Sequence, residues 1–104
     1  MVTTADNSRE ERYEIMVDGE LAGFAEYRGH GPVRAFTHTE IDGRFAGRGL
    51  ATELVRAALD DAREQGAHVI PICAFVRAFL AEHREYLDLV DARVRDAFGL
   101  PEPG

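Results

Sequence analysis

The chain has 104 residues, a formal net charge of −7 and an ordinary hydrophobic content of 45%, which favours one domain and argues against disorder. No apolar run approaches the roughly 20 residues of a membrane span, and the polar N-terminus lacks the apolar core of a signal peptide, so a cytoplasmic protein is expected. The acidic balance argues against nucleic acid as a partner, and the single cysteine, Cys73, excludes an intrachain disulfide.

The N-terminal third of the chain predicts two paired strands after a tail. Residues 1–10 are expected to be flexible, and the domain to begin at residue 11. Residues 12–17, "RYEIMV", alternate apolar and polar side chains as a strand does. Asp18-Gly19 suits a two-residue hairpin turn in which both residues adopt positive φ, and residues 21–27 form the returning strand.

Residues 33–41, "VRAFTHTEI", predict a third strand. Strict alternation places Thr37, Thr39 and Ile41 on one face and Phe36, His38 and Glu40 on the other.

The second half of the sequence changes to a helical period at Leu50 and continues as one apolar stripe up to residue 62. Gly66 stands where a helix would end in a left-handed cap. Residues 68–76 predict a buried strand that loses a neighbour or bulges at Pro71, and residues 77–98 predict a helix interrupted near His83. The expected fold is α/β, a small mixed sheet with β-β-β-α-β-α order, in a single domain of residues 11–98 followed by a tail, 99–104.

A glycine-rich turn, "GRFAGRG", leads directly into this helix. Glycines let the backbone approach an anion at a helix N-terminus, so the turn suits a phosphorylated ligand. A Walker A loop is excluded because Gly47-Arg48-Gly49 lacks the Lys-Ser/Thr ending. The dinucleotide pattern fits poorly because Thr52 stands at its third glycine.

The segment from Arg44 to Gly49 matches the pattern Gln/Arg-x-x-Gly-x-Gly/Ala and resembles the acyl-CoA pyrophosphate loop of the GNAT superfamily of N-acetyltransferases. From Phe36 to Val90 the sequence resembles the compact, single-domain GNAT-like subfamily, which implies a truncated GNAT-like fold that binds acetyl-CoA as cosubstrate. The resemblance implies cofactor contacts from two segments, the strand before the turn and the turn itself: Thr39, Ile41, Arg44, Phe45, Ala46, Gly47, Arg48 and Gly49.

Acetyl transfer to an amine requires a group that takes the proton of the amine, and Glu40 and His38 are the candidates. Each could instead be an ordinary solvated or half-buried strand residue. In the family that the chain resembles, a cysteine at the position of Cys73 has been proposed as catalytic, so acetyl-Cys73 is a second route. Cys73 could equally be a small buried hydrophobe, and Tyr86, a possible acid, is interpreted as a packing residue.

The acceptor is expected to be an amine of a small molecule or a protein, and the chain to be a monomer or weak dimer. No metal is expected, because His30, His68, His83 and Cys73 lack metal-ligand spacing. The rival hypothesis is a CoA-binding or protein-interaction module without catalysis.

Overall fold

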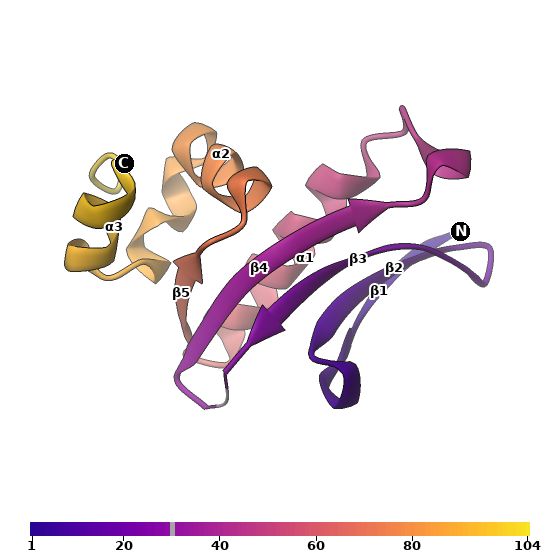
Figure 1. Cartoon of the computed structure of the whole chain (residues 1–104), viewed down its shortest axis with the longest axis horizontal. Helices are drawn as coiled ribbons and strands as arrows, with labels where there is room; N and C mark the ends of the chain where they lie inside the picture. The colour runs from indigo at the N-terminus through magenta and orange to yellow at the C-terminus, as the bar shows by residue number, and fades with distance from the viewer. Residues whose placement is uncertain (30) are drawn as a thin grey trace.

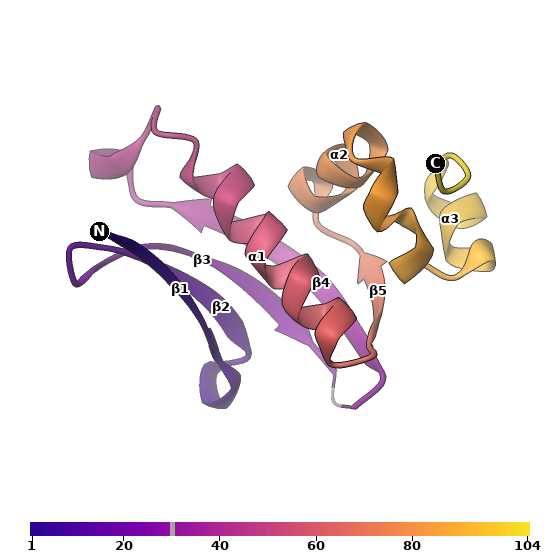
Figure 2. The same cartoon turned by 180° about the vertical axis from the view of Figure 1, so that it is seen from behind.

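The computed structural model describes residues 1–29 and 31–104. Its five strands form one sheet in the order β1-β2-β3-β4-β5, and helix α1 crosses one face of that sheet (Figures 1 and 2). The elements are β1 (Val2–Asn7), β2 (Arg12–Val17), β3 (Glu20–Arg28), β4 (Val33–Ile41), α1 (Leu50–Glu64), β5 (His68–Pro71), α2 (Ala74–Glu82) and α3 (Ala92–Phe98), with short 3-10 helices η1 (Ser8–Glu10), η2 (Gly43–Phe45) and η3 (Arg84–Leu89).

The predicted α/β class and the mixed sheet are confirmed, but the prediction of a flexible N-terminal tail is wrong. Residues 2–7 form β1, which pairs antiparallel with β2 over its full length. The side chains of β1 are almost all exposed, so the strand carries no apolar alternation that could have revealed it. The predicted hairpin turn is confirmed, with φ of 50° at Asp18 and 84° at Gly19.

The prediction of the two faces of β4 is wrong for its first half. Across from β3, the register slips so that Glu26 opposes His38 and Tyr27 opposes Phe36, which leaves Thr37 as an extra residue in a bulge. A bulge shifts the alternation of side chains by one position. Phe36 is therefore buried on the α1 face, the face that Thr39 and Ile41 share beyond the bulge, whereas His38 points to the opposite, outer face.

Helix α1 holds the sheet through the apolar stripe that the sequence predicts. Leu54 and Leu59 are fully buried, together with Val55, Ala58 and Ala62. Truncating a buried leucine of this kind costs about 2–5 kcal/mol of unfolding free energy. As predicted, Gly66 adopts a left-handed conformation after the helix, with φ of 70°.

Strand β5 lies parallel to β4 but is shorter than predicted. The pairing runs only from Val33 opposite His68 to Phe36 opposite Pro71, and the last contact is a hydrogen bond from Cys73 N–H to the Phe36 carbonyl, at 2.8 Å. The pairing ends after Pro71, where the Ile72 N–H donates to the Ile70 carbonyl at 3.1 Å instead of to β4. The two strands then diverge, as Figure 1 shows, so Cys73 caps α2 instead of lying within a strand.

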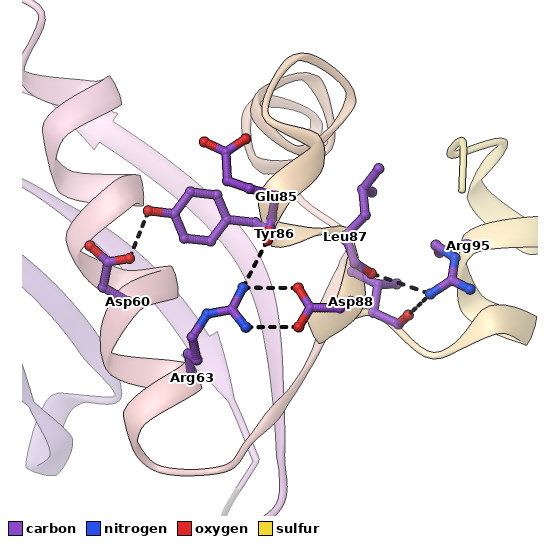
Figure 3. A network of polar contacts seen from close by, with 8 residues as sticks. Asp60, Arg63, Glu85, Tyr86, Leu87, Asp88 and Arg95 are labelled. Atoms are coloured by element: carbon purple, nitrogen blue, oxygen red, sulfur yellow. Dashed lines mark hydrogen bonds and ion pairs between the residues drawn. The ribbon is translucent and has the colours of Figure 1, made fainter. Parts of the chain in front are cut away.

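The C-terminal region consists of α2, η3 and α3, with the predicted interruption at His83 confirmed. Polar contacts connect η3 to α1, and α3 to η3 (Figure 3). Arg63 of α1 donates to both carboxylate oxygens of Asp88, at 2.7 and 2.9 Å, and to the Glu85 carbonyl. Arg95 of α3 donates to the Leu87 carbonyl of η3.

Residues 100–104 have no helix or strand, but they are not free of the domain. Arg84 donates to the Glu102 carbonyl, and Leu100 packs against the core. In the described part of the chain no helix has the length and apolar character needed to cross a bilayer.

Candidate functional site

The glycine turn reaches α1 through two left-handed residues, with φ of 79° at Gly47 and 71° at Gly49. Gly49 is the N-cap of α1 and provides no side-chain acceptor, so the N–H groups of the first turn keep their hydrogen-bonding capacity. A Cβ built on either glycine would meet nothing within 4 Å. Both glycines therefore have open space beside them, and the positive end of the helix dipole lies at this turn.

This turn forms one wall of a cleft of about 270 Å³. Six of the predicted cofactor-binding residues line it, Ile41, Phe45, Ala46, Gly47, Arg48 and Gly49, together with Leu50, Ala51, Thr52 and Phe75. Phe75 is an exposed aromatic residue on the first turn of α2. The sequence analysis did not identify Phe75, because it predicts a buried strand over residues 68–76 and not the start of a helix.

The two arginines of the turn have different environments. Arg44 lies outside the lining of the cleft and is paired with Asp42 and Glu20, each at 3.2 Å. The Asp42 carboxylate, and then that of Glu20, raise the pKa of Arg44. Arg48 lines the cleft, stacks over the Phe45 ring at 5.4 Å, and has no salt bridge within the described residues.

The free edge of β4 continues from this cleft. Beyond Phe36, no strand of the described chain pairs with β4 on the side of β5. The Phe36 carbonyl points to that side, and residues on the same face of a strand direct their backbone groups the same way. The N–H and C=O groups of Thr39 and Ile41 are therefore directed to the open edge.

Cys73 lies on the α1 side of this edge. Its side chain is buried, with 8% of the residue exposed, and its Sγ atom is 3.4 Å from the Thr39 hydroxyl. His38 is not placed to activate this thiol, because the side chain of His38 lies on the opposite face of β4. Thr39 is the polar partner that Cys73 has instead.

His38 and Glu40 form a pair on the outer face. The His38 Nε2 and Glu40 Oε1 atoms are 3.1 Å apart, and both side chains are more than half exposed. Glu40 also lines a hollow of about 100 Å³ with Leu21, Phe24, Asp42 and the β3 backbone. An imidazole bonded to a carboxylate can accept a proton from a neighbouring amine, and this face is the one from which an amine could reach the pair.

Tyr86 and His83, two other residues named from the sequence, have partners within the fold. The Tyr86 hydroxyl donates to Asp60 at 2.6 Å, and burial, followed by this hydrogen bond, raises the pKa of Tyr86. The His83 ring stacks on Phe79, and His30 lies outside the described residues. Within residues 1–29 and 31–104, no group of three or more His, Cys, Asp or Glu side chains is arranged to hold a metal ion.

Comparison with known proteins identifies the family. Residues 12–89 match the profile of the GCN5-related N-acetyl-transferase family, so the chain belongs to that family. No curated protein matches the sequence.

Solved structures show the same fold. A GCN5-like protein from Staphylococcus aureus matches with a TM-score of 0.63 and 20% identity, covering 88% of this chain and 87% of that one. Ard1 from Thermoplasma volcanium matches with a TM-score of 0.50 and 25% identity, over 59% of this chain and 43% of its own. N-acetylglutamate synthase from Neisseria gonorrhoeae, solved with coenzyme A and N-acetyl-glutamate, has a TM-score of 0.52 and 17% identity, over 86% of this chain and 23% of its own. The chain thus spans less than half the length of the latter two proteins.

Proposed function

We propose that this chain binds acetyl-CoA in the cleft at the start of α1 and transfers its acetyl group to a primary amine. The observation that carries the proposal is the cleft itself, which combines an uncapped helix N-terminus, two open left-handed glycines and one unpaired arginine. These groups match the needs of a pyrophosphate, which are many N–H donors, close backbone approach and positive charge. Membership of an acetyltransferase family supports acetyl-CoA as the ligand.

The open edge of β4 suits the pantetheine arm. That arm carries amide groups, and the outward N–H and C=O groups of Thr39 and Ile41 offer it the pairing that a neighbouring strand would give. The edge begins beside the cleft, where Ile41 belongs to both, and ends near Cys73. This path directs the thioester towards the point where β4 and β5 separate, and a backbone N–H at this edge can stabilise the oxyanion.

In the direct route, the amine nitrogen attacks the thioester carbon from the outer face. The new C–N bond forms as the C–S bond breaks, the CoA thiolate leaves, and the amine proton passes to the His38–Glu40 pair directly or through water. We favour this route because both side chains are more than half exposed on the outer face of β4, the strand whose edge is open here.

In the alternative route, the Cys73 Sγ first accepts the acetyl group from the thioester and then yields it to the amine. The Thr39 hydroxyl is the side chain that contacts this sulfur. The residue is nearly buried, so this route requires the thioester to reach a confined sulfur atom. Cys73→Ala separates the two routes, because it abolishes only the second.

The first experiment is calorimetric titration of the protein with acetyl-CoA, with ATP and NADH as controls, followed by intact mass measurement. Selective binding of acetyl-CoA is expected. An added acetyl mass that disappears in Cys73→Ala would establish the covalent route. Turnover of an amine panel by Cys73→Ala, with loss in Glu40→Gln, would establish the direct route.

Two outcomes contradict the proposal. If acetyl-CoA does not bind at high micromolar concentration, the cleft does not hold CoA. If it binds tightly but no amine is acetylated, the chain is the non-catalytic CoA-binding module that the sequence also allowed.

A further inference from the structure

The two edges of the sheet are finished in different ways. At the β5 edge, Pro71 has no N–H, and the carbonyls of Pro71 and Ile72 accept hydrogen bonds from the Arg77 side chain. Proline and bound side chains are devices that stop an edge strand from pairing with another chain. The β1 edge, which lies at the other side of the sheet (Figure 2), has no such device among residues 2–7.

The outward backbone groups of β1 can be assigned from its pairing. The Met1 carbonyl accepts a hydrogen bond from Asp18 N–H, and the register with β2 is regular from Val2 to Asn7. Because hydrogen-bonded pairs alternate along an antiparallel ladder, the backbone groups of Val2, Thr4 and Asp6 point away from β2. These three alternate residues are all of the outward positions of β1, so their N–H and C=O groups can pair with a further strand.

We propose that β1 pairs antiparallel with β1 of a second copy of this chain, with Thr4 on the two-fold axis. In this register, Thr4 opposes Thr4 of the other copy, and Val2 opposes Asp6. Every outward N–H of one strand then meets an outward C=O of the other. The result is one continuous sheet made of two five-stranded halves, in which both α1 helices lie on the same face.

The side chains of β1 are compatible with this pairing. Asp6 is the only charged side chain of the strand, and the register places it across from Val2, so no like charges face each other. The Asp6 carboxylate already accepts a hydrogen bond from the Tyr27 hydroxyl at 2.8 Å, which holds it over the sheet instead of over the open edge. The β1 edge of a second copy therefore complements this one in its hydrogen bonding and in its charge.

The contact is a single pair of strands, with few buried side chains. An association of this kind is weak, because short strand pairs add little apolar burial to their hydrogen bonds. We expect a monomer at low micromolar concentration that becomes a dimer as the concentration approaches the millimolar range. Because β1 lies at the edge opposite β5, dimerisation should leave the acetyl-CoA cleft unchanged.

The test is sedimentation equilibrium over that concentration range with variants of Thr4. Thr4→Lys should weaken association about fivefold, since like charges in a directly opposed pair cost up to about 1 kcal/mol. Thr4→Glu should do the same. An equimolar mixture of the two variants should recover or exceed the wild-type affinity, because each lysine then opposes a glutamate.

A second variant tests the backbone. Thr4→Pro removes only an outward N–H and should give a monomer at all concentrations, whereas Thr4→Ala keeps the N–H and should still dimerise. Circular dichroism and thermal unfolding would show whether each variant keeps the fold. The proposal is overturned if the wild-type chain stays monomeric throughout, if Thr4→Lys dimerises as well as the wild type, or if the Lys and Glu variants fail to associate with each other.

Discussion

At its N-terminus, α1 begins at a glycine that has no side-chain cap, whereas its last turns are bonded to three other elements. Asp61 accepts hydrogen bonds from Tyr13 of β2 and Arg34 of β4, and Arg63 is bonded twice to Asp88 of η3. Figure 3 shows the second of these connections. The two ends of one helix thus differ in whether their polar groups have partners within the chain.

This difference separates binding from stability. Unpartnered N–H groups at the start of a helix contribute little to folding, and they are available to a ligand. Ion pairs and hydrogen bonds at the other end connect the helix to the rest of the domain, with no direct role at the cleft. Substitutions at the two ends should therefore change different measured quantities, and four predictions test this.

The largest effect is expected at the glycine turn. Gly47→Val should lower the affinity for acetyl-CoA on the order of a hundredfold, because a β-branched residue disfavours the left-handed conformation that directs the amides into the cleft. The measurement is calorimetric titration. Gly99→Val is the matched control, since Gly99 also has a left-handed φ, of 68°, and open space beside it, but follows α3.

Both valine variants should lose about 1–2 kcal/mol of unfolding free energy, and only Gly47→Val should lose the ligand. Equal binding by the two variants would contradict the assignment of the cleft.

The next effect separates the two arginines. Arg48→Ala should weaken acetyl-CoA binding about tenfold, because Arg48 offers an unpaired charge at the cleft. Arg44→Ala should weaken it only about twofold, because the Arg44 guanidinium is already paired with Asp42 and Glu20. In titrations at low and high salt, the affinity of the wild type for acetyl-CoA should fall more steeply with salt concentration than that of Arg48→Ala. The reverse order of the two variants would show that Arg44 leaves its carboxylates to bind the ligand.

A smaller effect is expected at the other end of the helix. Arg63→Ala should cost about 1 kcal/mol of unfolding free energy, because it removes the bonds to Asp88 and to the Glu85 carbonyl. Affinity for acetyl-CoA should not change. Denaturant unfolding provides the measurement, and the exposed Arg93 provides the control, Arg93→Ala, which should leave stability within about 0.5 kcal/mol of wild type. A loss of affinity in Arg63→Ala would link the two ends of α1.

The smallest effect depends on pH. The hydrogen bonds from Arg63 hold the pKa of Asp88 below its ordinary value, so the pair stabilises the fold above the unfolded pKa of about 3.9. That contribution is lost as the pH falls through the lower, folded value. Since Asp88 is half exposed, solvent screening limits it to about 0.5 kcal/mol. Asp88→Asn should be less stable than wild type by this amount at pH 7, and the difference should vanish in strong acid.

The sequence predicts an element well where its local residue pattern and its tertiary contacts favour the same conformation. Asp18-Gly19 is a hairpin turn in both, and the apolar period after Leu50 produces a helix of the predicted extent. The glycine turn could be predicted to form the cleft because left-handed glycines and a helix start are local features. Strand β1 could not be predicted, because its side chains are exposed and only the edge of β2 gives it a partner.

The catalytic candidates depended on long-range structure. The sequence places His38 by strict alternation in the third strand and Cys73 within one strand of residues 68–76. In the structure, the bulge at Thr37 places His38 on the face opposite to Phe36, and β5 ends at Pro71, before Cys73. Both changes arise from how β4 meets its neighbours, which the sequence of a single strand does not encode. The Thr39–Cys73 contact could have been found only by knowing the true face of Thr39.

The bulge at Thr37 has a further consequence for how this chain can change in evolution. One inserted residue acts as a phase shift, so the strand has one side-chain phase before Thr37 and the opposite phase after it. Deleting Thr37 would remove the bulge and leave Phe36, Thr39 and Ile41 on the same face, because Phe36 and Thr39 would become alternate residues of a regular strand. If the strand became regular with Thr37 still present, either Phe36 would leave the core or Thr39 and Ile41 would rotate away from the edge of the cleft. In related sequences, the loss of one residue between positions 36 and 38 should therefore leave the faces of the residues around the site unchanged.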